Sequence, residues 1–451
     1  MKKMKTLTIL FAGMMLLLSA CDVKEASPGK SLSENAAKIG TSTAPAATPT
    51  PEVVPNLGGR VIKASAWWDL KPAGDTASEK ARLAKIAEVE KKYNVKFEFV
   101  NVPYAEYMNK FTTTVLAGEP FADIVQMEYR SALPAILKGQ LLLVSEFTTP
   151  DNNINKEANL LKKLPEIAGG EYAFSDPATL GVGIHYNRDV FKKLGLPDLQ
   201  ELYAKGEWTW DKFLEIAKQA TKDTDNDGKI DVWGFSGWSI NTVRHLTVAN
   251  GGMIVDTAKK KEHISDPKTI QALEFVNKMY NIDKVVKVKT DNKMNWSESN
   301  TYKDGDIAMF IAAEWNLSGL KYDFGVVPIP LGPTGSKEAT YAYTSQSGKF
   351  IPKGVKDPQL VYKIFEETFD IPQTEEYPGQ NHLESLYKHQ EDINMVREHI
   401  AGTGMTSLDD AYPNFPMYEF IEEVLVKNTS VTAAAEIYKQ QAQAAIDKLG
   451  Q

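Results

Sequence analysis

Acidic residues alternate along the segment that runs from Asp223 to Asp231, Asp-Thr-Asp-Asn-Asp-Gly-Lys-Ile-Asp. Carboxylates stand at its first, third, fifth and ninth positions, and Gly228 stands where a calcium loop must turn sharply. Ca²⁺ takes about six to eight oxygen ligands, which alternate residues of a tight loop can direct toward one point. The pattern predicts a structural Ca²⁺ site whose ligands are Asp223, Asp225, Asp227, the backbone carbonyl of Lys229, and Asp231.

The segment departs from a calcium-binding helix–loop–helix motif at its twelfth position. Gly234 stands there instead of the glutamate that binds the ion through both carboxylate oxygens. A further ligand must therefore come from elsewhere, or the affinity is weak. The alternative interpretation is an acidic turn that is simply solvated.

Tryptophans are the second group of residues with a chemical role to explain, and all eight lie between Trp67 and Trp315. Several follow predicted strands, and ligands of open α/β sheets bind at the carboxyl ends of strands. An aromatic face beside carboxylates and amides suits a sugar, which presents apolar C–H faces and polar hydroxyls. The alternative interpretation is that the tryptophans pack in the core. The predicted ligand-binding residues are Trp67, Trp68, Glu128, Tyr129, Trp238, Glu314, Trp315 and Asn316.

Patterns typical of catalysis are sparse in this sequence. The six histidines are scattered without zinc-ligand spacing, and neither a Gly-x-Ser-x-Gly motif nor a phosphate-binding loop occurs. We therefore expect a binding protein that has no catalytic residues. Two alternatives remain open at this point: a secreted carbohydrate-active enzyme with a carboxylate pair, and a surface sensor or adhesin without a role in import.

The elements that would position these candidate residues are strands and helices that alternate along the chain. Runs of apolar residues or period-two alternation predict strands, and spacing near 3.6 residues predicts helices. This alternation indicates α/β lobes with mostly parallel sheets. The predicted strands are 61–67, 95–99, 123–125, 181–186, 307–312 and 324–327, and the predicted helices are 79–93, 104–116, 132–138, 189–194, one capped by Thr209, 270–280 and 432–449.

The amino-terminal residues have the pattern of an export signal. Lys2, Lys3 and Lys5 precede an apolar run that is too short for a stable membrane span. Cys21, the only cysteine, follows directly after this run, in Leu-Ser-Ala-Cys, which resembles the lipobox of bacterial lipoproteins. The resemblance implies cleavage after residue 20, lipidation of Cys21 and attachment to the membrane; the alternative is a cysteine buried in the signal. Residues 21–57, rich in Ser, Thr, Ala and Pro, predict a disordered tether.

Length and charge limit the possibilities further. The chain has 451 residues, a length that suggests two or three domains. Its formal net charge of −8 argues against binding to nucleic acid, which leaves a basic footprint.

Four parts of the sequence resemble extracellular solute-binding proteins of family 1, the lipoprotein receptors of sugar importers. Ala122 stands in the first of these where that family usually has proline. Each likeness is weak alone, but their order along the chain is specific. The resembling segments are 116–125 (LAGEPFADIV), 184–191 (IHYNRDVF), 208–213 (WTWDKF), and the pair 305–309 (GDIAM) and 324–330 (FGVVPIP).

The resemblance implies a two-lobed periplasmic-binding-protein-like fold of type II, which closes around a solute at a hinge. It also implies a monomer on the extracytoplasmic face of the membrane that delivers a carbohydrate, expected to be an oligosaccharide, to the permease subunits of an ABC importer. We expect the N-terminal lobe to comprise 58–165 and 305–355. The C-terminal lobe would comprise 166–304 and 356–451.

Overall fold

The structure is a computed structural model that describes residues 54–145, 169–174, 181–336, 342–343, 347–377, 379–401, 404–405 and 409–449. The predicted signal segment, Cys21 and most of the predicted tether lie outside the described residues. Among the described residues, no helix combines the length and the apolar character that crossing a membrane requires.

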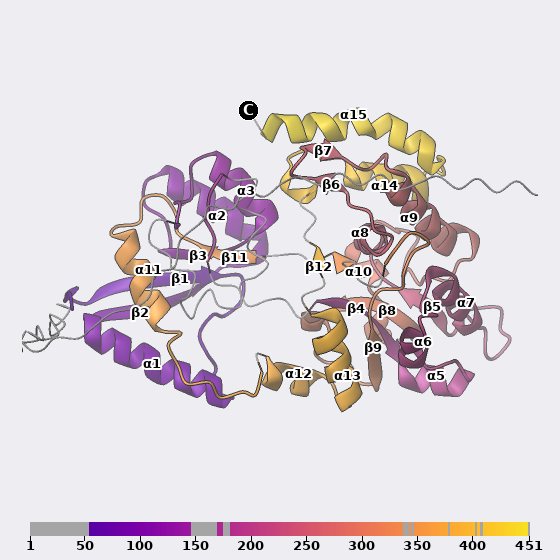
Figure 1. Cartoon of the computed structure of the whole chain (residues 1–451), viewed down its shortest axis with the longest axis horizontal. Coiled ribbons are helices and arrows are strands. Elements are labelled where there is room, and N and C mark those ends of the chain that lie inside the picture. The colour runs from indigo at the N-terminus through magenta and orange to yellow at the C-terminus, as the bar shows by residue number, and fades with distance from the viewer. Residues whose placement is uncertain are drawn as a thin grey trace, which may run out of the picture. The chain divides into compact units, whose positions relative to one another are not determined.

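Four strands form a first sheet in the order β11-β3-β1-β2 (Figure 1). β1 runs parallel to β2 and β3, while β11 runs antiparallel to β3. The strands are β1 (Arg60–Ala66), β2 (Val95–Asn101), β3 (Ile124–Glu128) and β11 (Ser347–Phe350), and the helices that accompany them are α1 (Ala77–Tyr93), α2 (Tyr104–Leu116), α3 (Tyr129–Leu137) and α11 (Pro358–Glu367).

Both faces of the first sheet are covered, because adjacent strand residues point in opposite directions. Ile124 of β3 belongs to an apolar cluster with Tyr93 of α1 and Phe365 of α11. Its neighbour Val125 belongs to a different cluster, which contains Phe111 of α2. The sheet is therefore enclosed by helices on both sides, as an α/β layer requires.

Local sequence signals explain the ends of α1. The Thr76 hydroxyl accepts a hydrogen bond from the Glu79 amide at 3.2 Å, and the Glu79 carboxylate accepts one from the Thr76 amide at 3.0 Å. This reciprocal capping box satisfies two amides that have no partner inside the helix. The helix ends at Asn94, whose left-handed φ of 50° stops further helical turns.

A second sheet has the order β5-β8-β4-β9 (Figure 1). β5 runs parallel to β8, but β4 runs antiparallel to both β8 and β9. The expectation of mostly parallel strands is therefore wrong for this sheet. The strands are β4 (Val182–Asn187), β5 (Trp233–Ser236), β8 (Ile307–Ala313) and β9 (Phe324–Val327).

Helices and two short ribbons accompany the second sheet. The antiparallel ribbon is β6 (Val255–Asp256) with β7 (Lys261–Glu262), and the parallel ribbon is β10 (Ala342–Tyr343) with β12 (Gly404–Met405). The helices are α5 (Arg188–Leu194), α6 (Leu199–Lys205), α7 (Trp210–Ala220), α8 (Ser239–Ala249), α9 (Pro267–Asn277), α10 (Trp296–Ser299), α12 (Gln380–Leu386), α13 (Gln390–Met395), α14 (Met417–Leu425) and α15 (Val431–Leu449).

Strand pairing differs from the expected division of the chain into lobes. β8 and β9, which fall within the segment 305–355 expected in the N-terminal lobe, are hydrogen bonded to β4 in the second sheet. Only β11 of that segment joins the first sheet. α11, expected in the C-terminal lobe, packs in the apolar cluster of β1 and α1. The remaining lobe boundaries stay a proposal.

Candidate functional site

A pocket of about 100 Å³, called the tryptophan pocket below, lies at the edge of the second sheet. β8 ends and β4 begins at this edge, because the two strands are antiparallel and Val182 lies opposite Ala313. α8 begins at the same edge because it follows β5, which runs parallel to β8. The described residues lining the pocket are Gly181, Val182, Trp238, Asn241, His245, Trp296, Asn300, Ile311, Ala312, Ala313, Glu314, Trp315 and Asn316.

Three tryptophans supply the aromatic surface of this pocket. Trp315 is 67% exposed and Trp296 is 47% exposed, so both rings are accessible to a solute. Trp238 is half-buried, and its indole N–H donates to the backbone carbonyl of Met294 at 2.8 Å. That bond fixes the Trp238 ring and leaves its surface, rather than its N–H group, for contact with a solute.

Amide, carboxylate and imidazole groups supply the polar part of the tryptophan pocket. The Asn241 side-chain oxygen accepts from Arg244 at 3.2 Å, and the Asn300 amide donates to the Trp296 carbonyl at 2.9 Å. Burial and the nearby Arg244 charge lower the pKa of His245 to about 3. His245 is therefore neutral near pH 7, and a neutral imidazole can both donate and accept a hydrogen bond.

Half of the predicted ligand-binding residues line this pocket. Trp238, Glu314, Trp315 and Asn316 are brought together there, and none of the other four belongs to its lining. Three lining residues that sequence reasoning missed are Asn241, Trp296 and Asn300.

Trp67 and Trp68 instead follow β1, at the carboxyl edge of the first sheet. The Trp67 ring meets Trp68 edge to face, with centroids 4.8 Å apart, and meets Tyr104 at 5.5 Å. Trp68 is 41% exposed. The Glu128 carboxylate accepts hydrogen bonds from the Tyr104 hydroxyl at 2.9 Å and from Arg130 at 2.6 Å. These residues therefore form a separate aromatic and polar cluster.

Tyr129 has a different environment from its neighbour Glu128. It is 2% exposed, and its ring lies edge to face against Phe350 with the centroids 6.3 Å apart. This burial favours the core-packing alternative for Tyr129. Its assignment to the ligand site gains no support from the structure.

A chain of charged groups runs from Glu128 to α8, and sequence reasoning missed it. Arg130 donates to Glu128 and, at 3.3 Å, to Asp410. Arg244 of α8 lies 3.7 Å from the same Asp410 carboxylate and donates to Asp409 at 3.1 Å. Burial raises the pKa of Asp410 to about 6, although Arg244 acts to lower it. No local pattern indicated this network, because its residues come from distant parts of the sequence.

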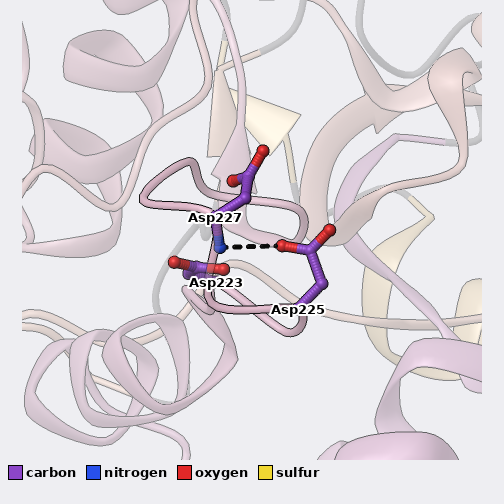
Figure 2. Close-up of side chains that lie close together, drawn as sticks. All are labelled: Asp223, Asp225 and Asp227. Atoms are coloured by element: carbon purple, nitrogen blue, oxygen red, sulfur yellow. Dashed lines mark hydrogen bonds between the residues drawn. The ribbon is translucent and has the colours of Figure 1, made fainter.

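The predicted calcium loop joins α7 to β5, and Figure 2 shows that Asp223, Asp225 and Asp227 lie close together. One carboxylate oxygen of each lies within 4.8 Å of the others. Loop amides orient these side chains: Asp225 accepts from the Asp227 amide at 3.0 Å, and Asp223 accepts from the Gly228 amide at 2.9 Å. Oxygen ligands on one tight loop fit a hard divalent cation.

The other predicted calcium ligands differ in their surroundings. Asp231 is not part of the three-carboxylate group, and its carboxylate accepts hydrogen bonds from the Thr224 amide and hydroxyl, each at 2.6 Å. These bonds lower its pKa. The Lys229 ammonium lies 3.4 Å from the Asp227 carboxylate. The role of the Lys229 backbone carbonyl as a calcium ligand stays a prediction.

Packing explains why Gly234 stands where a calcium loop has its glutamate. A Cβ atom at this position would lie 2.1 Å from the carbonyl oxygen of Ala217 in α7. No side chain fits there unless the helix and the strand move apart. Residue 234 therefore cannot supply the missing ligand.

Solved structures of binding proteins resemble this chain over nearly their full length. The substrate-binding protein Lmo0181 from Listeria monocytogenes, in complex with cycloalternan, has a TM-score of 0.60 at 17% identity and covers 87% of this chain and 99% of its own. UgpB from Mycobacterium tuberculosis, in complex with glycerophosphocholine, has a TM-score of 0.63 at 18% identity, covering 87% and 100%. The maltose/maltodextrin-binding domain MalE from Bdellovibrio bacteriovorus, bound to maltotriose, has a TM-score of 0.57 at 17% identity, covering 86% and 99%.

These likenesses confirm the two-lobed periplasmic-binding-protein fold predicted from the sequence. No curated protein matches the chain. The family model described as "Bacterial extracellular solute-binding protein" matches residues 73–366, more than half of the chain. Members of such a family bind solutes, in agreement with the expected receptor that is not an enzyme. The chain therefore belongs to the family of bacterial extracellular solute-binding proteins.

Proposed function

We propose that this protein is a lipid-anchored receptor that captures a carbohydrate, specifically an oligosaccharide, and delivers it to an ABC importer. The observation that carries the proposal is the tryptophan pocket, where two exposed tryptophans stand beside amide and carboxylate groups. Aromatic faces stack on the C–H surfaces of a sugar ring, while paired donors and acceptors bind its hydroxyl groups.

Structural relatives support a carbohydrate as the solute. Lmo0181 has been solved with cycloalternan and MalE with maltotriose, and both of these ligands are saccharides. A third relative, CpMnBP1, has been solved with mannobiose at a TM-score of 0.58 and 19% identity. An oligosaccharide needs several aromatic contacts, which Trp296 and Trp315 would provide together.

Delivery requires that the loaded receptor differs in shape from the empty one. We propose that solute binding favours closure of the two lobes about a hinge, because closure buries more of the solute. The cluster of Trp67, Trp68, Tyr104 and Glu128 would then serve as a second contact surface. The permease would distinguish the closed receptor from the open one.

The test begins with a thermal-shift screen of the purified protein against neutral oligosaccharides, since a bound ligand raises the melting temperature. Binding of the best oligosaccharide is then measured by titration calorimetry for the protein and for Trp315→Ala. We expect the substitution to raise the Kd at least about tenfold, because it removes a stacking surface. An unchanged Kd would rule out a role for Trp315.

Tyr418→Ala is the matched control, because Tyr418 on α14 is 44% exposed and lies outside the tryptophan pocket. It should leave the Kd unchanged. Circular dichroism melts of both variants show whether either substitution disturbs folding.

Import itself distinguishes the proposal from a surface sensor or adhesin. Cells that lack the protein should fail to take up the radiolabelled oligosaccharide, and a plasmid copy should restore uptake. Normal uptake in the deletion strain, together with tight binding in vitro, would favour the sensor or adhesin.

We also propose that the loop 223–231 binds a structural Ca²⁺. The grouped carboxylates of Asp223, Asp225 and Asp227 support this, since they present oxygen atoms on a loop that is already turned. Remaining ligands would come from the Lys229 carbonyl, from water, and from Asp231 after it leaves Thr224. The absence of a carboxylate at residue 234 predicts weak affinity.

A further inference from the structure

Asn241 and Arg244 lie on the same side of α8, because residues three positions apart on a helix are neighbours. Asn241 is half-buried and belongs to the lining of the tryptophan pocket. Its side-chain oxygen accepts a hydrogen bond from the buried Arg244 guanidinium at 3.2 Å. A residue in the wall of the pocket is therefore in direct contact with a cation of the same helix.

The chemistry of the two groups determines which end of the Asn241 amide faces the arginine. A guanidinium only donates hydrogen bonds, whereas an amide side chain has an accepting oxygen and a donating NH₂ group. Arg244 can therefore pair only with the oxygen, since the opposite orientation would bring donors against donors. This contact turns the NH₂ group of Asn241 away from Arg244.

Arg244 is itself held in place by Asp409. Asp409 is fully buried, and its carboxylate accepts hydrogen bonds from Nε of Arg244 at 3.1 Å and from Nη2 at 2.5 Å. Hydrogen bonds between charged groups are about twice as strong as those between neutral groups, so this pair gives the guanidinium a defined position. Nη1 of Arg244 is then the nitrogen directed at Asn241.

From this geometry we infer that Arg244 is a positioning residue, which orients Asn241 so that its NH₂ group donates a hydrogen bond to an oxygen atom of the bound saccharide. The solute must then present an acceptor at this wall of the pocket, namely a hydroxyl, ring or glycosidic oxygen. Because the amide is oriented before the solute arrives, less conformational freedom is lost on binding. The inference rests on the proposed function, since it assigns the direction of one hydrogen bond in the same site.

Fluorinated sugars test the direction of this hydrogen bond, because fluorine in place of a hydroxyl can accept a hydrogen bond but cannot donate one. Titration calorimetry gives the Kd of maltotriose, mannobiose and α-1,4-galactobiose, and then of singly fluorinated derivatives of the one that binds most tightly. Asn241→Asp keeps an oxygen for Arg244 but replaces the NH₂ group by an acceptor, to which a hydroxyl can still donate. At one sugar position we expect the ratio of fluorinated Kd to parent Kd to be at least about tenfold larger for Asn241→Asp than for the unaltered protein.

Asn109→Asp is the matched control, because Asn109 is exposed on α2, lies outside the pocket lining and undergoes the same change in net charge. It should leave every ratio unchanged. Equal ratios for the unaltered protein and for Asn241→Asp at all sugar positions would mean that Asn241 donates no hydrogen bond to the sugar, and the inference would be overturned.

Arg244→Lys tests the positioning role. Lysine keeps the positive charge beside Asp409, but it lacks the planar fork that reaches two partners at once. We expect Arg244→Lys to raise the Kd of the parent saccharide at least about threefold when Asn241 is present, and to leave the Kd unchanged in an Asn241→Ala background. An equal effect in both backgrounds would show that Arg244 acts by another route, which also overturns the inference.

Failure of the proposed function has a different pattern. If none of these saccharides binds the unaltered protein, the carbohydrate assignment itself is contradicted. If a saccharide binds but its fluorinated derivatives respond equally to the unaltered protein and to Asn241→Asp, only the inference fails. The fluorine comparison does not require Arg244→Lys, so it decides the inference even where that buried substitution prevents folding.

Discussion

Exposure separates the tryptophans that can contact a solute from those that hold the core together. Trp208 is 3% exposed, and its indole N–H donates to the Pro328 carbonyl at 2.7 Å. Trp210 is equally buried and stacks on Phe275 with the ring centroids 4.8 Å apart. Trp296 and Trp315 have about half or more of their surface accessible instead. The same type of side chain is thus packed in the core at Trp210 of α7 and exposed at the tryptophan pocket.

Sequence reasoning identified the pocket residues that directly follow a strand. Glu314, Trp315 and Asn316 come after β8, where side chains gather at the edge of a sheet. Trp296 and Asn300 belong to the region of the short helix α10, which no strand precedes. Their contribution depends on how a long connection folds back, and residue spacing does not encode that.

Asp392 is a buried carboxylate whose charge the fold has to accommodate. It accepts hydrogen bonds from Arg188 at 2.8 Å and from Gln200 at 2.8 Å. The Val326 amide of β9 donates to it at 3.2 Å. Burial nevertheless raises its pKa to about 6, against the opposing influence of Arg188.

This raised pKa predicts a pH dependence of stability. Between about pH 4 and pH 6 the folded protein holds a proton on Asp392 that the unfolded chain has lost, so stability falls as pH rises. The resulting decrease in the free energy of unfolding amounts to at most about 3 kcal/mol and stays constant above pH 6. Urea unfolding of the protein and of Asp392→Asn at several pH values isolates this contribution. All other titratable groups are present in both proteins, so their effects cancel in the difference.

The free energy of unfolding of the protein, minus that of Asp392→Asn, should decrease from pH 4 to pH 6 and then level off. A difference that stays flat over this range, or increases, would mean that the pKa of Asp392 is not raised. The variant with Asn also keeps an acceptor for Gln200, which limits the loss of packing.

Helices and strands followed their local patterns closely. The predicted helix 104–116 and strand 324–327 match α2 and β9, and Thr209 caps α7 by accepting from the Lys212 amide at 3.4 Å. Strand direction was not predictable in the same way. β4 has the same apolar pattern whether its neighbours run parallel or antiparallel, since periodicity reports burial and not direction.

The predicted calcium loop joins α7 to β5, so a bound ion should stabilise this connection in the folded protein. Addition of CaCl₂ should raise the melting temperature of the protein, because the proposed site would bind Ca²⁺ in the folded loop and not in the unfolded chain. Asp223→Asn should abolish this rise, since Asp223 belongs to the carboxylate group and anchors two loop amides. Scanning calorimetry with CaCl₂ or EDTA makes the measurement.

Asp291→Asn serves as the control for that experiment, because Asp291 is an exposed aspartate outside the loop. It should retain the full response to CaCl₂. A protein whose melting temperature is the same in CaCl₂ and EDTA would support the solvated acidic turn instead.

Membrane attachment concerns the chain as a whole, and it is predicted from Cys21 together with the export signal before it. Cys21→Ser removes the sulfur that would carry a lipid, so the protein should move from the membrane fraction to the soluble fraction. Fractionation followed by immunoblotting measures this change, and labelled palmitate should no longer be incorporated. Asp22→Ala is the control and should remain membrane-bound. A Cys21→Ser variant that stays in the membrane fraction would contradict the lipid anchor.

The division of the chain between two sheets was only partly accessible to prediction. The resemblance to a family gave two lobes, and strand spacing gave the strands themselves. Which sheet β8 and β9 join depends on long-range pairing with β4, and no local property of residues 305–327 records that partner.

The late arrival of β11 has a consequence for how this protein is made. Gln126 of β3 donates to Ser347 of β11, and 221 positions of sequence separate them. While the chain is synthesised from its amino terminus, the outer edge of β3 lacks its neighbour until most of the polypeptide has emerged. An open strand edge is a template for association between chains. Export in an unfolded state, with folding after the whole polypeptide has crossed, would let β11 reach that edge before another molecule does.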